Sequence, residues 1–408
     1  MVTAPAEHYV GLDIGTSTVR CVIGMVDPAN PTHPSIIGHG SATNLGMRKG
    51  VVVHIEDVID AVVQAVTEAE RLSGIHVHKA TVNINGSHVS GMNSRGVIAI
   101  SVANREITAE DRLRVEEAAT IVQLPPNREI IQVFAKNYRL DGQDNIKDPV
   151  GMHGVRLEVD THIVTAASPN LKSLDSVLEK AHVAPDNHVV SSLAAAEAVL
   201  NRQQKESGTL LLDIGAGTTN MVVIEDGEVQ HVAVIPVGGI HITNDLAIGL
   251  KTDLDIAETV KVQHATLGEL PDSMITVQLD NVSHQFSADE VKMITEARVE
   301  ELLELVDKEL KRIHRSRKLP GGVVLVGGTA KLPGIAALTK EKLQLAARIG
   351  QLQPLGGLVD TVQDVAFTTA IGLMILDMLL VPAQANPLGQ PDTNVFGLIN
   401  GLLRRFKK

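Results

Sequence analysis

The pattern of hydrophobic and polar positions repeats itself about halfway along the chain. Leu12-Asp13-Ile14-Gly15-Thr16-Ser17-Thr18 returns 200 positions later as Leu212-Asp213-Ile214-Gly215-Ala216-Gly217-Thr218. Each copy lies between two short apolar runs, and the second of these runs are Cys21–Ile23 and Met221–Ile224. Short apolar runs on either side of a Gly/Thr turn are typical of a β-hairpin. We therefore expect a duplicated α/β unit in which each half opens with a hairpin.

Beyond these hairpins the apolar spacing becomes helical. Residues Asp57–Leu72 carry apolar side chains at helical intervals, and Gly74 is placed to end that helix. Residues Ser287–Lys318 predict a long, highly charged helix that begins with the capping box Ser287-x-x-Glu290. Asp226-Gly227, between two further apolar runs, predicts another hairpin turn. The chain is α/β throughout.

Two other segments do not follow the repeat. Residues Lys79–Thr165 predict the order strand, strand, helix, strand, strand, with the helix at Thr108–Val122, so we expect a small α+β unit inserted into the first half. The longest apolar stretch, Ala370–Ala383, is interrupted by Asp377 and is shorter than the ~20 residues of a membrane-spanning helix. We expect a buried helix there, and no segment that crosses a bilayer.

Composition narrows the class of protein. The 408 residues are 44% hydrophobic and 21% charged, which is usual for a soluble globular protein of two or more domains. The net charge of −12 argues against a nucleic-acid binder, because phosphate contacts need a basic face. Cys21 is the only cysteine, so no intrachain disulfide is expected and a reducing cytoplasm fits. The first ten residues lack the features of a signal peptide.

The two Asp-Ile-Gly turns suggest a site for phosphates. Glycine lets backbone N–H groups approach a phosphate without intervening side chains, and Thr and Ser hydroxyls add donors. An Asp at the strand end is suited to hold the water shell of Mg²⁺. Two such hairpins that face one another would clamp a triphosphate from both sides. The alternative is a pair of ordinary tight turns, which the matched Asp and Gly residues of the two copies disfavour.

Other phosphate motifs are absent or out of context. No G-x-x-x-x-G-K-[ST] sequence occurs. Gly215-Ala216-Gly217 is followed by Asn220 where a dinucleotide fingerprint has Gly, and by a strand where it has a helix. A third glycine site, Gly327-Gly328-Thr329-Ala330, follows the buried run Val323–Val326. It would admit a flat ligand such as a base, and a plain strand–helix turn is an equally good interpretation.

The order of these three sites resembles the phosphate-1, phosphate-2 and adenosine motifs of the actin superfamily. The resemblance implies an actin-like fold that binds ATP and Mg²⁺, with Asp13 and Asp213 contacting the metal through water. Phosphates and metal would be held by Asp13, Gly15, Thr16, Ser17, Asp213, Gly215, Gly217, Thr218 and Thr219. The adenosine would lie at Gly327 and Gly328, with Gly238 and Gly239 near the ribose and Glu258 and Lys261 near base and ribose.

The same resemblance extends to two helices that connect the halves. Ser191–Ala196 resembles the first connecting helix and Ala366–Leu376 the second. Relatives that hydrolyse ATP well carry Glu or Gln at the start of the first helix to orient water. Here Ser191 takes that position, and Glu197 comes later. We therefore expect ATP binding with weak hydrolysis at most, and no catalytic residue is assigned.

The C-terminal segment has a composition of its own. Residues 382–393 contain three Pro and one Gly and few apolar side chains, as in a flexible linker. In residues 394–408 an apolar face with basic residues at its end is typical of a helix that lies in the plane of a membrane. A helix docked on the protein itself, or on a partner, is the alternative. The membrane contacts would come from Val395, Phe396, Ile399, Leu402, Leu403, Arg404, Arg405, Phe406, Lys407 and Lys408.

The insert and this tail resemble the FtsA family within the superfamily. That resemblance implies an inserted SHS2-like subdomain called 1C, and an actin-like protein that polymerises at the cytoplasmic face of the membrane and anchors FtsZ. Partners would be FtsZ, further copies of the chain, anionic lipids and, through 1C, other division proteins. The implied divisions are 1–78 (1A), 79–165 (1C), 166–194 (1A), 195–248 (2A), 249–316 (2B), 317–355 (2A), 356–381 (1A), 382–393 (linker) and 394–408 (membrane helix).

Two alternatives remain open from the sequence. One is a pilus-assembly ATPase of the PilM type, which shares the inserted unit, works through a membrane partner and lacks such a tail. The other is a small-molecule kinase on the same scaffold, although we find no carboxylate placed to accept a substrate proton.

Overall fold

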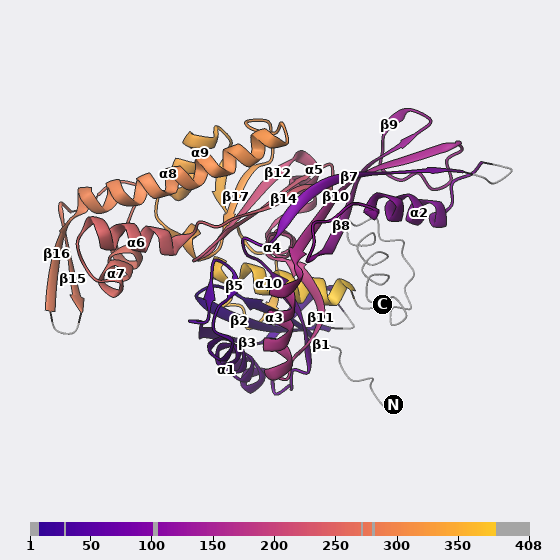
Figure 1. Ribbon diagram of the computed structural model, residues 1–408. Coiled ribbons are helices and arrows are strands. Elements are labelled where there is room, and N and C mark those ends of the chain that lie inside the picture. Colours follow the sequence, from indigo (N-terminus) through magenta and orange to yellow (C-terminus); the bar gives the residue numbers. More distant parts are fainter. Residues whose placement is uncertain (1–7, 28–29, 101–104, 271, 280–281, 381–408) are drawn as a thin grey trace.

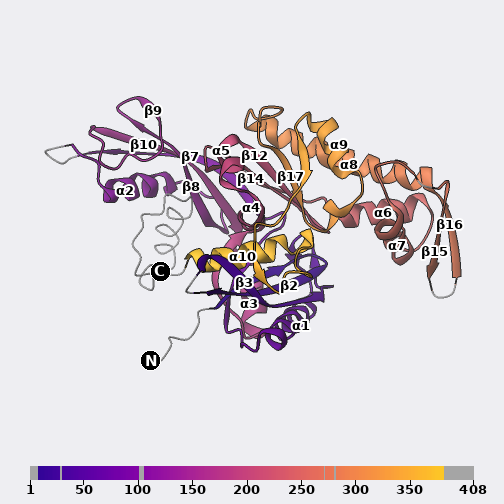
Figure 2. The ribbon, with the colours of Figure 1, turned by 180° about the vertical axis from the view of Figure 1, so that it is seen from behind.

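A computed structural model describes residues 8–27, 30–100, 105–270, 272–279 and 282–380. Two α/β halves lie one above the other, and α4 and α10 pack together between them (Figure 1). The inserted unit and the hairpin β15–β16 project at opposite ends of the second half, as the view from behind also shows (Figure 2). No helix in the described part of the chain is both long and apolar enough to cross a membrane.

The two central sheets have the same topology, which confirms the predicted duplication. In each half an antiparallel three-strand meander continues into strands parallel to its first strand. The first sheet has the order β11-β6-β1-β2-β3-β19, with bounds Ala184–Val190, Lys79–Ile84, His8–Ile14, Thr18–Asp27, Asn30–Thr43 and Gly356–Gly357. The second has the order β14-β13-β12-β17-β18, with bounds Glu228–Ile235, Thr219–Glu225, Thr209–Ile214, Gly322–Val326 and Ala347–Ile349.

Helices cover both faces of the first sheet because its strands are apolar on both sides. The helix α1 (Ile55–Ser73) packs on β2 and β3, and Gly74 ends it in the left-handed conformation, as predicted. The apolar stretch near residue 370 forms the buried helix α10 (Thr368–Leu380), which packs on β1. The remaining elements of this half are β4 (Met47–Arg48), β5 (Val51–Val52), α3 (Ser168–Lys180), α4 (Ser191–Val199) and η2 (Val365–Phe367).

The second half carries an extension on one side. Its long helix α8 (Ala288–Arg312) begins at the Ser287 cap, whose hydroxyl accepts the N–H of Glu290. It ends six residues before the predicted Lys318, because His314 and Arg317 adopt left-handed backbone conformations. The other elements are α5 (Arg202–Ser207), α6 (Gly239–Gly249), α7 (Leu254–His264), β15 (Met274–Leu279), β16 (Val282–Ser287), η1 (Gly328–Lys331) and α9 (Ile335–Leu343).

The insert is smaller than the sequence suggested. The strand at Lys79–Ile84 pairs with β1 and β11 in the first sheet, so the insert begins after it. Its own sheet has the order β7-β10-β8-β9, with bounds Ser90–Ala99, Arg156–Ala167, Arg128–Leu140 and Gln143–Ile146. The predicted helix is α2 (Ala109–Thr120), and a reciprocal capping box of Thr108 and Asp111 begins it.

A buried histidine joins the insert to the second half. His162 of β10 accepts the N–H of Val232 in β14 at its Nε2 atom, 3.0 Å away. Its Nδ1 therefore carries the proton and donates to Asn93 Oδ1, at 2.8 Å. Burial, with smaller contributions from the nearby His231 and Lys136, lowers the pKa of His162 to about 3. The neutral ring is thus part of the junction.

This junction predicts a loss of stability in acid. Because the folded pKa lies below the unfolded value of about 6.5, protons bind the unfolded chain first as the pH falls. The contribution of His162 is complete above about pH 6.5 and shrinks by about 1.4 kcal/mol per unit below it. Urea titrations should show a His162→Gln variant with a correspondingly weaker decline between pH 7.5 and 5. His78→Gln, at an exposed position, should decline like the wild type; equal slopes for all three proteins would contradict the prediction.

Candidate functional site

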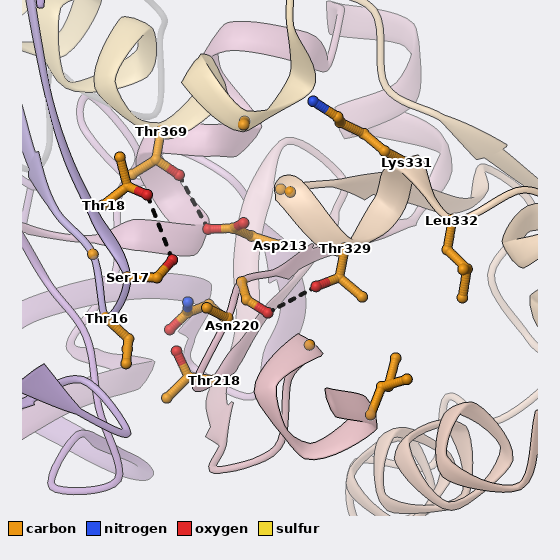
Figure 3. A pocket seen from close by; sticks show the side chains of 18 of the residues that line it. Thr16, Ser17, Thr18, Asp213, Thr218, Asn220, Thr329, Lys331, Leu332 and Thr369 are labelled. Carbon is orange, nitrogen blue, oxygen red and sulfur yellow. Dashed lines mark hydrogen bonds between the residues drawn. The ribbon is translucent and has the colours of Figure 1, made fainter. Parts of the chain in front are cut away.

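The two Asp-Ile-Gly turns meet at one cavity. Each turn is closed by the same hydrogen bond, from Gly15 N–H to Thr18 O at 3.1 Å and from Gly215 N–H to Thr218 O at 2.9 Å. A Cβ atom added to Gly217 would lie 2.8 Å from the Thr16 side chain, so the turns of the two halves are in contact. Figure 3 shows Thr16 and Thr218 on neighbouring sides of the pocket. The turns line a cavity of about 330 Å³, a size that suits a small ligand.

The two aspartates are buried in the wall of this cavity. Asp13 Oδ1 accepts Asn83 Nδ2–H at 2.7 Å, and Asp213 Oδ2 accepts the Thr369 hydroxyl at 3.0 Å. Burial raises the pKa of Asp13 to about 7, with a smaller rise from Asp213 and a lowering by Arg20. Burial also raises the pKa of Asp213. Two buried carboxylates in one cavity are suited to a cation, because a positive ion would offset the cost of ionising them.

Direct protein ligands for a metal are few. Among the described residues no group of three or more His, Cys, Asp and Glu side chains is placed to hold a metal ion. The contact of Asp13 and Asp213 with Mg²⁺ through water stays a prediction, and Mg²⁺ usually keeps several of its waters when it binds a protein.

Two residues that we did not predict lie across the hairpins from these aspartates. In the strand register Arg20 is the partner of Asp13, and Asn220 is the partner of Asp213. Both line the cavity. The Oδ1 atom of Asn220 is buried and has no hydrogen-bond partner within the described chain, which suits a ligand or a bound water. The hairpin register would have indicated both residues.

The far end of the cavity is suited to a flat, partly apolar group. Ile242, Val262, Leu332 and Pro333 line it. Glu258 and Lys261 of α7 also line the cavity, and both side chains contact Thr243 Oγ1, at 2.5 and 2.9 Å. Lys261 Nζ lies 2.6 Å from Glu258 Oε2, so the pair forms one hydrogen-bonded group at the cavity edge.

The third glycine site lies beside Asp213. Gly327 has a positive φ of 89°, and a Cβ atom there would lie 2.4 Å from Asp213 Oδ1. Only glycine fits that position. Gly328 has open space around it, and both residues line the cavity. The Thr329 hydroxyl donates to Gly215 O at 3.0 Å, which ties this loop to the second turn (Figure 3).

Some predicted residues lie behind the cavity wall. Thr219 is fully buried and its hydroxyl donates to Val237 O, so it supports the strand and does not face the cavity. Gly217 and Gly238 are not among the lining residues, although Gly239 is. A Cβ atom on Gly238 would lie 2.6 Å from Gly215 O, so this glycine allows α6 to approach the second turn. The first N–H groups of α6 donate to the carbonyls of that turn.

The connecting-helix residues also lie outside the cavity. Ser191 is buried and its hydroxyl accepts from Asn83 Nδ2 at 3.1 Å. Glu197 is paired with Lys205. Neither residue lines the cavity, whose carboxylates are Asp13, Asp213 and Glu258. The predicted membrane residues Val395–Lys408 lie outside the described residues.

Comparison with known proteins identifies similar chains. The sequence matches the family "SHS2 domain inserted in FTSA" over residues 86–165 and the family "Cell division protein FtsA" over residues 210–372. The cell division protein FtsA of Bacillus subtilis (strain 168) is 38% identical over 374 residues, which cover 90% of this chain and 83% of that protein.

Solved structures share the fold at low sequence identity. The PilM-PilN type IV pilus biogenesis complex aligns with a TM-score of 0.65 and 17% identity, over 92% of this chain and 99% of that one. MreB 5 of Spiroplasma citri bound to AMPPNP aligns with a TM-score of 0.53 and 15% identity, over 94% and 100%. These likenesses show an actin-like fold, as predicted.

Proposed function

Because this chain belongs to the FtsA family of cell-division proteins, we propose that it binds ATP with Mg²⁺ and anchors FtsZ filaments to the membrane. The single observation that carries the nucleotide proposal is that both Asp-Ile-Gly turns, from separate halves, line one cavity. The solved MreB 5, which shares the fold, was bound to AMPPNP. A nucleotide in this cavity would touch both halves at once, so its presence would favour a closed arrangement of the two.

The lining residues suit the parts of an ATP molecule. Thr16 and Ser17 offer hydroxyl donors at the first turn, and Arg20 supplies positive charge. Asp13 and Asp213 would hold Mg²⁺ through its waters, with the unpartnered Asn220 Oδ1 as an additional acceptor. The bound metal would neutralise phosphate charge. The base would lie at the apolar end, near Val262 and Leu332.

We propose that nucleotide acts as a structural switch more than as a fuel. Hydrolysis needs a group that orients or deprotonates the attacking water. Ser191 is buried away from the cavity, and the cavity carboxylates Asp13 and Asp213 are assigned to the metal. The third cavity carboxylate, Glu258, is assigned to the base and ribose end and is paired with Lys261. Turnover should therefore be slow, and binding itself would set the shape of the subunit that forms actin-like filaments.

The two projecting units give places for partners. FtsZ would dock on residues 249–316, which include α7, β15, β16 and α8. The insert, which projects at the opposite end (Figure 1), would contact neighbouring copies and other division proteins. Both assignments rest on membership of the family.

Membrane attachment is assigned to residues 394–408. Each basic residue near an anionic leaflet contributes ~1 kcal/mol, and the apolar side chains add more on burial. One such segment binds reversibly, whereas several on one filament would bind firmly by avidity. The protein would therefore lie at the cytoplasmic face of the membrane as a peripheral protein.

Removing Val395–Lys408 should abolish this attachment. In flotation with vesicles that contain anionic lipid, we expect the bound fraction to fall at least about tenfold, because both the apolar and the basic contributions are lost. A variant with the same fourteen residues in an order that spreads the apolar positions around the helix is the matched control, and it should also fail to float. Unchanged flotation of the deletion would reject the assignment.

The whole proposal is tested by co-sedimentation. The protein should pellet FtsZ filaments with lipid vesicles, more strongly with MgATP than without nucleotide. Calorimetry that detects no uptake of an adenine nucleotide would refute the nucleotide part.

The PilM-type alternative rests on the fold alone, because the similarity to that structure is 17% in sequence. The small-molecule kinase alternative predicts that a sugar or acid strongly stimulates ADP release, and a substrate panel would reveal it.

A further inference from the structure

Asn85 connects the two halves at the phosphate end of the cavity. It follows β6 in the first half and lines the cavity together with the two turns. Its side-chain oxygen accepts the hydroxyl of Thr218, which belongs to the second turn, at 3.1 Å. Thr218 is 2% exposed, so this hydrogen bond is sheltered from water. The bond therefore crosses the cleft between the halves.

The wall behind Asn85 is built of backbone. A Cβ atom on Gly50 would lie 2.2 Å from Asn85 Oδ1, and Gly50 has a positive φ of 73°. Gly86, the next residue, also has a positive φ, of 119°. Gly50 N–H donates to the Thr16 hydroxyl at 3.2 Å, so the same wall holds the first turn. Two glycines thus bring the backbone close to the amide, which is supported from behind and faces the cavity.

The orientation of the cavity gives Asn85 a specific neighbour. The base would lie at the end formed by Val262 and Leu332, whereas Asn85 lies at the turns. A nucleotide that spans the cavity brings its last phosphate to the turns. Asn85 Nδ2 has no acceptor among the described residues, and a carboxamide N–H is a good donor to a phosphate oxygen.

We propose that Asn85 is the residue that distinguishes ATP from ADP, with Nδ2 donating to the terminal phosphate while Oδ1 holds Thr218 across the cleft. This inference rests on the proposed binding of ATP. The terminal phosphate of ATP would then be connected through Asn85 to Thr218 of the other half. With ADP, the Nδ2–H group of Asn85 would have no phosphate oxygen to bond. The contact between the two turns would then differ between the ATP-bound and the ADP-bound protein.

The test measures dissociation constants for MgATP and MgADP by calorimetry on the full chain. Asn85→Asp keeps the size and the acceptor for Thr218, but it replaces the donor with a charged oxygen. We expect ATP affinity to fall at least about tenfold and ADP affinity to stay within about threefold, because only the terminal phosphate faces the new charge. Asn85→Ala, which adds no charge, should lower ATP affinity about fivefold with the same selectivity.

Two controls separate this role from a structural one. Asn244→Asp makes the same substitution at an exposed position of α6 and should leave both affinities unchanged. The thermal midpoints of the nucleotide-free Asn85 variants should lie close to that of the wild type, and Asn85→Ala carries the test if Asn85→Asp does not fold. Equal weakening of ATP and ADP, or unchanged ATP affinity, would overturn the inference. Wild-type protein that binds neither nucleotide would overturn the proposed function itself.

Discussion

Replacing Gly372 with valine should leave no folded protein. Gly372 lies in α10 where this helix crosses α4, and a Cβ atom there would be 1.7 Å from the carbonyl oxygen of Ala194. The obstacle is backbone of a buried helix, so a side-chain rotation cannot relieve it. Even Gly372→Ala, which favours a helix by about 1 kcal/mol, should lose more than about 3 kcal/mol of unfolding free energy.

The measurement is soluble yield for the valine variant and urea unfolding for the alanine variant. Ala297→Val adds two methyl groups at an exposed position of α8 and is the control for added bulk in a helix. Its unfolding free energy should change by less than about 1 kcal/mol. A Gly372→Ala protein as stable as the wild type would show that α4 and α10 do not touch at this point.

The effect would extend to the nucleotide cleft. The helix α10 also carries Thr369, whose hydroxyl bonds Asp213 of the other half. Gly11 of β1 packs against the same helix, and a Cβ atom there would lie 2.1 Å from Ala370 O. The close crossing of α10 with α4 and β1 therefore sets the distance across which the two halves share the site.

Local patterns predicted the parts of the fold that local interactions decide. The hairpin at Leu12–Thr18 and the turn at Asp226-Gly227 could be read because turn chemistry and apolar runs act within a few residues. The strand at Lys79–Ile84 was recognised, but its sheet was not. Alternation of apolar residues does not reveal which strand lies beside it, and here the neighbours are β1 and the distant β11.

The site residues also fall into those that local sequence patterns could predict and those that they could not. Asp13 and Asp213 were found because each stands in a repeated motif. Arg20 follows from the hairpin register, which places it opposite Asp13, and could have been found. Asn85 and Thr369 could not, because their contacts with Thr218 and Asp213 join residues more than 130 positions apart. Thr219 was assigned to the site by its neighbours in sequence, yet strand alternation turns its side chain into the core.

Asp13→Asn should separate the two roles of a buried carboxylate. The amide has the same shape, and its oxygen can still accept Asn83 Nδ2–H, so the fold should be kept. The charge that would hold the hydrated metal is lost. We expect the affinity for MgATP to fall about a hundredfold, at the upper end of the effect of altered metal-site contacts. Without Mg²⁺, ATP should bind no more weakly than to the wild type, because one negative charge no longer faces the phosphates.

Without nucleotide, the same Asp13→Asn substitution should stabilise the fold. The folded pKa of Asp13, about 7, lies above its unfolded value of 3.8, so ionisation at pH 8 costs stability that returns as the pH falls through 7 toward 4. Removing this carboxylate should therefore raise the unfolding free energy at pH 8 by a few kcal/mol. Asp226→Asn, in an exposed turn with a φ of 58° that asparagine tolerates, should change neither quantity. Urea unfolding and calorimetry on the same samples measure both quantities. An Asp13→Asn protein that binds MgATP as well as the wild type, or that is less stable without nucleotide, would show that Asp13 is not a carboxylate kept buried for a cation.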